Sequence, residues 1–198
     1  MGVSLTDGQR EIMLCTSGGK AICFPEEEVR PMGREATGVR GVRLADDQRV
    51  ISLLVLGEGL VLTASENGYG KLTPLEDFPG HSRGGQGVIA LQTTDRNGNT
   101  VAMLQVEPGH ELMLVSSSGV LVRTPVSDIS VVGRNTQGVR LIRLGDGERL
   151  TGVERVEKLE GEDIDAAVPE EGAPGDGPGD VPGDPPGDAG PGEGATTS

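Results

Sequence analysis

The stretch that decides the fold is GRNTQGVRLIRL at residues 133–144. It repeats, in register, the stretch GREATGVRGVRL at residues 33–44. A sequence segment that recurs at a fixed spacing indicates internal copies of one structural unit. The arginines that the two stretches share are the pairs Arg34 and Arg134, Arg40 and Arg140, and Arg43 and Arg143.

A third copy lies between these two. Residues 11–44, 59–91 and 111–144 align on glycine, proline and arginine. In each copy a glycine stands fifteen residues before a key arginine, a proline stands nine before it, and another glycine follows it by four. The key arginines are Arg34, Arg83 and Arg134. Three landmarks that coincide in three copies predict three units of about fifty residues each.

Each unit has the pattern of short β-strands. Apolar runs such as LVLTA, VAMLQV and LMLVSS are bounded by glycine and polar residues. Asn67-Gly68 and Ser118-Gly119 are predicted hairpin turns, because glycine tolerates a positive φ. No segment keeps a helical period over about twelve residues. We therefore predict an all-β fold, a propeller-like array of blades that stabilise one another by stacking.

The predicted array occupies residues 1–158, with repeats at about 5–50, 51–100 and 101–158. The remaining residues, 159–198, have a different composition. They contain eleven of the acidic residues and no lysine or arginine, so most of the net charge of −14 lies there. Residues 174–188 read PGDGPGDVPGDPPGD. Proline, glycine and like charges cannot fill a core, which predicts a disordered acidic tail.

The sequence offers no catalytic constellation. No nucleophilic triad is recognisable, and SGGK at residues 17–20 lacks the spacing of a phosphate-binding loop. Cys15, Cys23, His81 and His110 lack the spacing of zinc ligands. We therefore expect no catalytic, cofactor-binding or metal-binding residues in this chain. With no apolar run of about 18 residues and no signal peptide, we expect a cytoplasmic protein without a membrane partner.

The lysines and arginines that recur in the repeats suggest an anionic ligand. Stacked blades place equivalent residues at equivalent points of a rim, and a basic rim suits a phosphate backbone bent around it. Aromatic side chains that could stack on unpaired bases are rare, which favours duplex over single-stranded nucleic acid. The candidate DNA-binding residues are Lys20, Arg34, Arg40, Arg43, Lys71, Arg83, Arg123, Arg134, Arg140 and Arg143.

Two other interpretations stay open. The arginine of the Gly-Arg-x-x-x-Gly unit could instead clamp a turn through backbone carbonyls, which concerns Arg34 and Arg134 in particular. The whole array could also be a propeller-like protein-interaction module without affinity for DNA. Such a module would show an apolar patch and little dependence on salt.

Three sequence segments resemble those of a known protein family. They are ENGYGKLT at residues 66–73, RGGQGVIAL at residues 83–91 and VSDISVVGRNTQGVRLIRL at residues 126–144. Over about residues 5–158 the chain resembles the C-terminal domain of the bacterial DNA gyrase A subunit, part of a type IIA topoisomerase. The resemblance implies a six-bladed β-pinwheel that wraps duplex DNA, of which this chain would hold about three blades.

The resemblance also implies a role and partners. The chain would support ATP-dependent negative supercoiling, together with the rest of the gyrase A subunit, and the gyrase B subunit would complete an A2B2 assembly. ATP and Mg2+ would bind to the B subunit, whereas this chain would hold no cofactor. The family's catalytic tyrosine lies outside the resembling stretch, and Tyr69 does not match it. An alternative within the same class is the C-terminal domain of topoisomerase IV.

Overall fold

A computed structural model describes residues 2–157 of the chain. The tail predicted at 159–198 lies outside the described residues. Within residues 2–157 there are eleven strands and three short 3₁₀ turns, with no α-helix. The prediction of an all-β fold is therefore confirmed. This described part of the chain contains no helix long and apolar enough to cross a membrane.

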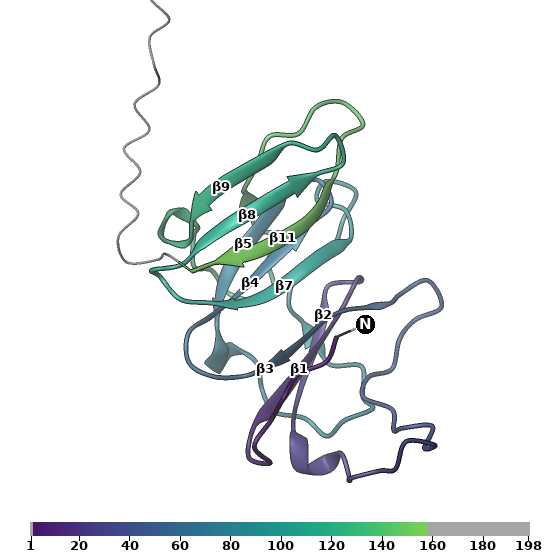
Figure 1. Cartoon of the computed structure of the whole chain (residues 1–198). Helices are drawn as coiled ribbons and strands as arrows, with labels where there is room; N and C mark the ends of the chain where they lie inside the picture. The colour runs from purple at the N-terminus through teal and green to yellow at the C-terminus, as the bar shows by residue number, and fades with distance from the viewer. Residues whose placement is uncertain (1, 158–198) are drawn as a thin grey trace, which may run out of the picture. The chain divides into compact units, whose positions relative to one another are not determined.

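The strands form three antiparallel sheets, which we call blades 1, 2 and 3 (Figure 1). Blade 1 contains β1 (Glu11–Thr16), β2 (Lys20–Pro25), β3 (Val50–Val55) and β6 (Val88–Ile89). Blade 2 contains β4 (Leu60–Ser65), β5 (Tyr69–Pro74), β7 (Thr100–Val106) and β10 (Val139–Arg140). Blade 3 contains β8 (Glu111–Ser116), β9 (Leu121–Pro125) and β11 (Leu150–Val156). A 3₁₀ turn follows the hairpin of each blade: η1 (Glu26–Glu28), η2 (Leu75–Asp77) and η3 (Val126–Asp128).

A tight hairpin is part of every blade. β4 pairs with β5 and β8 pairs with β9, in antiparallel register. Gly68 and Gly119 occupy the turns with φ of 78° and 86°. That left-handed conformation is accessible to glycine without steric cost, so the two hairpins predicted from the sequence form where expected.

Blades 1 and 2 are each completed by a strand from the repeat that follows in the chain. β6, from the second repeat, pairs with β2 of blade 1 and places Ile89 opposite Lys20. β10, from the third repeat, pairs with β5 of blade 2 and places Arg140 opposite Tyr69. Within residues 2–157, β9 of blade 3 has no such fourth strand. Adjacent blades are therefore joined by backbone pairing as well as by packing.

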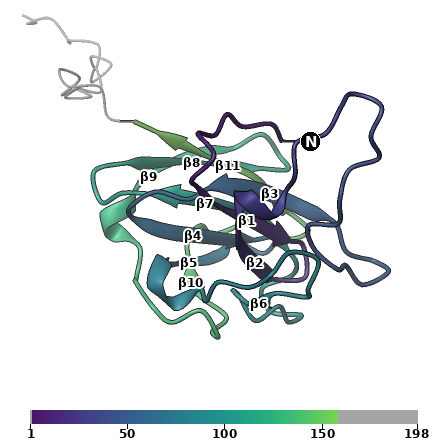
Figure 2. The ribbon, with the colours of Figure 1, turned by 90° about the horizontal axis from the view of Figure 1, so that it is seen from below.

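The apolar core lies between neighbouring blades, whose strands are labelled in Figure 2. Met13 of blade 1 packs in one cluster with Val61 and Met103 of blade 2. Leu62, the neighbour of Val61, packs in a second cluster with Leu112 of blade 3. Because side chains alternate across a strand, β4 uses one face for each neighbouring blade. Stacking thus buries both faces of blade 2.

Candidate nucleic-acid interface

A highly charged hollow lies at the edge of blade 2. It is a cavity of about 530 Å³ where the start of β5, the turn at 94–98 and the segment at 139–149 meet. We call it the Tyr69 pocket. Its charged lining comprises Arg96, Arg140, Arg143, Arg149, Asp146 and Glu148. Four guanidinium groups against two carboxylates leave an excess of positive charge, which suits an anionic ligand.

Tyr69 holds two of these arginines in place. Arg140 donates a hydrogen bond from Nη2 to the Tyr69 hydroxyl at 3.0 Å. The guanidinium carbons of Arg96 and Arg140 lie 4.7 and 5.5 Å from the centre of the Tyr69 ring. Hydrogen bonding by Arg140 and then by Arg96 lowers the pKa of Tyr69. Within residues 2–157, neither arginine forms a salt bridge with a carboxylate, so both charges can act on a ligand.

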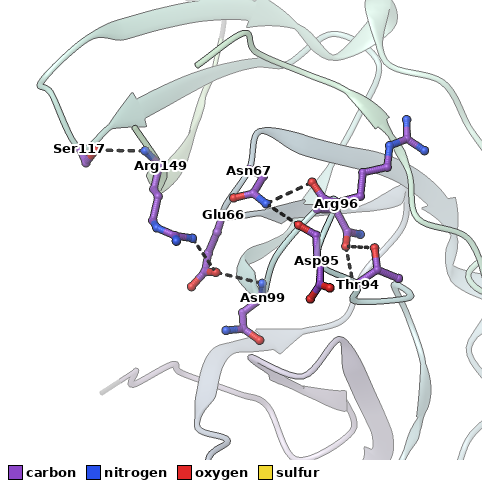
Figure 3. Close-up of polar contacts among 9 residues, drawn as sticks. Glu66, Asn67, Thr94, Asp95, Arg96, Asn99, Ser117 and Arg149 are labelled. Atoms are coloured by element: carbon purple, nitrogen blue, oxygen red, sulfur yellow. Dashed lines mark hydrogen bonds and ion pairs between the residues drawn. The ribbon is translucent and has the colours of Figure 1, made fainter. Parts of the chain in front are cut away.

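Two asparagines fix the turn that carries Arg96. Asn67 donates from Nδ2 to the carbonyl oxygens of Asp95 and Arg96, at 3.2 and 3.1 Å (Figure 3). Asn97 is fully buried and donates from Nδ2 to the carbonyl of Gln92 at 2.7 Å. Because side-chain amides satisfy the carbonyls of the turn, the backbone under Arg96 has a defined conformation.

Among the residues that the structure describes, Arg149 is the one cation of the pocket that is paired with an acid. Its Nη1 lies 3.3 Å from the Glu66 carboxylate, which also accepts the backbone N–H of Asn99 (Figure 3). The backbone N–H of Arg149 donates to the Ser117 hydroxyl at 3.1 Å. Arg149 therefore ties blade 3 to blade 2. Arg96, Arg140 and Arg143 carry the uncompensated charge of the pocket.

The carboxylate of Glu148 is stabilised by hydrogen-bond donors from neighbouring residues. Hydrogen bonding by Ser116, Ser118 and the Gly145 amide lowers the pKa of Glu148 to about 2. The Gly145 amide donates to it at 2.7 Å. A carboxylate engaged by three donors has little capacity left to pair with an arginine across the pocket.

Lys71 does not lie on the surface, in contrast to the expectation from the sequence. The residue is fully buried, and its ammonium donates to the carbonyl of Gly133 at 2.7 Å, to the carbonyl of Arg134 and to the Thr136 hydroxyl at 3.0 Å. A buried ammonium with three protein acceptors is saturated. Lys71 is therefore a structural residue that holds the loop at 133–136, and we remove it from the candidate interface.

The side chains of Arg83 and Arg134 hydrogen-bond to backbone carbonyls of the preceding repeat, and we call this contact a carbonyl clamp. A structural role of this kind was one of the two interpretations of the Gly-Arg-x-x-x-Gly motif. Arg83 donates from Nε to the carbonyl of Glu28 at 2.8 Å and from Nη1 to the carbonyl of Arg40 at 3.2 Å. Arg134 donates from Nη1 to the carbonyl of Ile89 at 3.1 Å. Both guanidiniums thus bind the preceding repeat.

The other candidates are on the surface, in different settings. Lys20 donates to the Gln86 side chain at 3.2 Å and lines, with Arg43, a small cavity of about 120 Å³ on blade 1. Arg123 is paired with Glu111. The side chains of Arg34 and Arg40 are exposed. Of the ten candidates, the structure brings Arg140 and Arg143 together on blade 2, and Lys20 and Arg43 together on blade 1.

Sequence reasoning missed three members of the pocket. Arg96 and Arg149 lie outside the repeated arginine-rich segment. Tyr69 was considered in the sequence only as a possible catalytic tyrosine. The available signal was the DRNGN stretch at 95–99, which has the composition of a tight turn. A turn predicted from its composition does not reveal which blade edge it faces.

Comparisons with known proteins agree with this architecture. The family model "DNA gyrase C-terminal domain, beta-propeller" matches residues 10–56, 59–107 and 110–157. The DNA gyrase A subunit of Salmonella typhimurium is 50% identical over 168 residues, covering 84% of this chain and 19% of that protein. The Pseudomonas aeruginosa protein of the same name is 53% identical over 171 residues, covering 86% and 18%. The chain thus spans about a fifth of the length of these relatives.

Two solved structures share the fold. A DNA gyrase A C-terminal domain superposes with a TM-score of 0.70 at 24% identity, covering 76% of this chain and 52% of that one. A topoisomerase IV C-terminal domain superposes with a TM-score of 0.74 at 26% identity, covering 79% and 49%. The three matched repeats cover most of the sequence. This chain belongs to the DNA gyrase C-terminal domain family of β-propellers.

Proposed function

We propose that this chain binds the phosphate backbone of duplex DNA, with the Tyr69 pocket as its main anchoring site. The observation that carries the proposal is the pair formed by Arg96 and Arg140. Both flank one phenol ring, and neither has a carboxylate partner within residues 2–157. Guanidinium groups held in place by stacking and hydrogen bonding lose little entropy when a phosphate binds.

Cations on neighbouring blades would extend the contact. Arg143 lines the same pocket, and Lys20 and Arg43 occupy the rim of blade 1. A ligand that touches both blades has to follow the curvature of the array. A bent duplex, bound through its backbone rather than through its bases, fits this requirement.

We further propose that the chain wraps DNA as part of a gyrase A subunit. In that role it would act with the remainder of that polypeptide and with the gyrase B subunit, in an A2B2 enzyme that supercoils DNA negatively in the cytoplasm. ATP and Mg2+ would then belong to the B subunit. The gyrase A subunits cited above are 50% and 53% identical to this chain, and this similarity supports gyrase. The two solved domains do not separate the two enzymes, because the gyrase domain is 24% identical and the topoisomerase IV domain is 26% identical.

Replacing the two stacked arginines tests the anchoring site. We expect the double variant Arg96→Gln/Arg140→Gln to bind a short duplex about 50-fold more weakly than the wild type at about 0.1 M salt. The slope of log affinity against log salt should become shallower by about 1.8, because two phosphate contacts are lost. Fluorescence anisotropy with a labelled duplex, repeated over a series of salt concentrations, measures both quantities.

A matched variant controls for net charge. Arg10→Gln/Arg155→Gln also removes two positive charges, but Arg10 and Arg155 are paired with Asp7 and Glu157, away from the pocket. We expect this variant to stay within about threefold of the wild type, since paired surface charges attract DNA only through the general field. If both double variants weaken binding equally, the Tyr69 pocket is not the anchoring site.

A further inference from the structure

The Tyr69 pocket is larger than a phosphate group of DNA requires. Its volume is about 530 Å³, within the range of about 300–1,000 Å³ that is typical of small-molecule sites. The cavity that Lys20 and Arg43 line on blade 1 is about 120 Å³, and the described residues around it include no acidic or aromatic residue. That smaller cavity suits a single phosphate group, whereas the Tyr69 pocket has room for a second part of a ligand.

The Tyr69 pocket also holds more positive charge than one phosphodiester neutralises. Arg96, Arg140 and Arg143 line it, and within residues 2–157 none of the three forms a salt bridge. The Arg96 side chain extends away from the Glu66 carboxylate, which is paired with Arg149 (Figure 3). Each phosphodiester of DNA carries one negative charge, whereas a di- or triphosphate chain carries several. Three unpaired guanidinium groups in one cavity therefore match a polyphosphate chain better than a single phosphate.

The fold itself positions the two arginines nearest to Tyr69. Arg140 donates from Nη2 to the Tyr69 hydroxyl at 3.0 Å. Asn67 fixes the turn below Arg96 by donating to two of its backbone carbonyls. Because this cationic wall is preformed, little conformational entropy is lost when an anion binds to it.

An apolar wall completes the same pocket. Ile142 and Leu144 belong to its lining. Ile142 is buried in the core cluster that blades 2 and 3 share, and Leu144 packs against that cluster. The shape of this wall is therefore fixed by the core. A nucleobase or a sugar ring can pack on such a surface, and the flat faces of guanidinium groups offer a further place for a base to stack.

An acid on a separate turn adds hydrogen-bond acceptors. Asp146 lines the pocket, is exposed, and forms no salt bridge within residues 2–157. The backbone amide of Glu148 donates to the carbonyl of Gly145 at 3.1 Å, and the Gly145 amide donates to the Glu148 carboxylate at 2.7 Å. These two bonds fix the turn that carries Asp146. A carboxylate accepts hydrogen bonds from ribose hydroxyls and from amino groups of a base, but it repels phosphate.

The three parts of the pocket together define the chemistry of a ligand. The ligand has an anionic chain for the arginines, a ring for the apolar wall and hydrogen-bond donors for the carboxylate. Inorganic polyphosphate supplies only the chain. Duplex DNA supplies only single phosphates here, because its bases are paired and stacked inside the helix. A free nucleotide with several phosphates supplies all three.

We propose that the Tyr69 pocket is a binding site for a free nucleoside polyphosphate. Its phosphate chain contacts Arg96, Arg140 and Arg143, its base or sugar packs on the apolar wall, and Asp146 accepts hydrogen bonds from the base or the sugar. The proposal rests on the proposed function in one respect, since the nucleotide occupies guanidinium groups that anchor DNA. The two ligands therefore compete, and the affinity for duplex DNA falls as the nucleotide concentration rises.

Isothermal titration calorimetry of the full chain tests the site with three probes: ATP, tripolyphosphate and adenosine, without divalent cations. We expect ATP to bind about tenfold more tightly than tripolyphosphate, because the base and the sugar add contacts. Adenosine should show no measurable binding, because it lacks the anionic chain. Equal affinities for ATP and tripolyphosphate would mean that the pocket accepts anions in general, and they overturn the proposal.

Two single substitutions test the contact with the base or the sugar. Asp146→Ala should weaken ATP binding about tenfold but should not weaken tripolyphosphate binding, since the carboxylate only repels that ligand. The matched control is Asp95→Ala, because Asp95 is an exposed acid that lines a neighbouring cavity rather than the Tyr69 pocket. It should leave the affinity for ATP within about twofold of the wild type. Equal effects of the two substitutions on ATP binding contradict the proposal.

The variant Arg96→Gln/Arg140→Gln separates this proposal from the proposed function. Its affinity for ATP should fall at least about tenfold, and ATP should release a labelled duplex from the wild-type chain at the concentrations at which it binds. If the variant loses DNA binding but keeps ATP binding, the nucleotide proposal fails and the DNA anchor stands. If the variant loses ATP binding but keeps DNA binding, the nucleotide site stands and the DNA anchor fails.

Discussion

Replacing Gly138 with alanine is expected to lower the free energy of unfolding by about 3 kcal/mol. Gly138 has a φ of 78°, and a Cβ there would lie 2.7 Å from the carbonyl oxygen of Gly70. The added methyl group has to push β10 away from β5, which also weakens the bonds from Leu141 and Ile142 to Gly68. Urea unfolding followed by circular dichroism measures the loss.

Gly38 provides a matched control within the same chain. It has a similar φ of 89°, but a Cβ there would meet nothing within 4 Å. Gly38→Ala should therefore cost only about 1 kcal/mol in dilute solution, the usual cost of a left-handed conformation for alanine. Equal losses for Gly38→Ala and Gly138→Ala would show that β10 does not press against β5 as described.

Replacing Lys71 with methionine is expected to lower the free energy of unfolding by about 2 to 3 kcal/mol. The change keeps the length of the side chain but removes the donors that hold Gly133, Arg134 and Thr136. Relief of the burial cost of the ammonium offsets part of this loss. Lys20→Met, which removes one bond to Gln86 at the surface, should cost less than about 1 kcal/mol. A loss at Lys71 no larger than that at Lys20 would contradict the structural role.

Lys71 should also give the stability a specific dependence on pH. Burial is the main cause that lowers the pKa of Lys71 from 10.5 to about 8. Between these values the unfolded chain keeps a proton that the native chain has released, so the contribution of Lys71 to stability rises from about pH 8 to 10.5. The rise should be absent in Lys71→Met when urea midpoints are compared across this range.

The repeats and hairpins could be predicted because they depend on local sequence. Asn67-Gly68 and Ser118-Gly119 specify tight turns wherever apolar strands flank them. The completion of a blade by the next repeat could not be predicted in this way. β6 and β10 contain two residues each, too few to show a period, and their pairing depends on contacts between repeats.

The candidate site was only partly predictable for a related reason. A lysine in a strand suggests solvent exposure, yet the acceptors of Lys71 come from a loop more than sixty residues later in the chain. The repeat pattern correctly aligns Arg34, Arg83 and Arg134 as equivalents. The clamping role of Arg83 and Arg134 depends on contacts with the preceding repeat, which the alignment does not show. Arg96 is brought over Tyr69 by tertiary packing alone.

The central claim is that exposed cations of blades 1 and 2 bind duplex DNA through its phosphates. The most direct test is the affinity of the full chain for a short duplex, measured across a range of salt concentrations. Contacts from Lys20, Arg43, Arg96, Arg140 and Arg143 predict a slope of log affinity against log salt of about −4.5, since each neutralised phosphate contributes about −0.9. Weak binding with a slope near zero would contradict the claim and would favour a protein-interaction module.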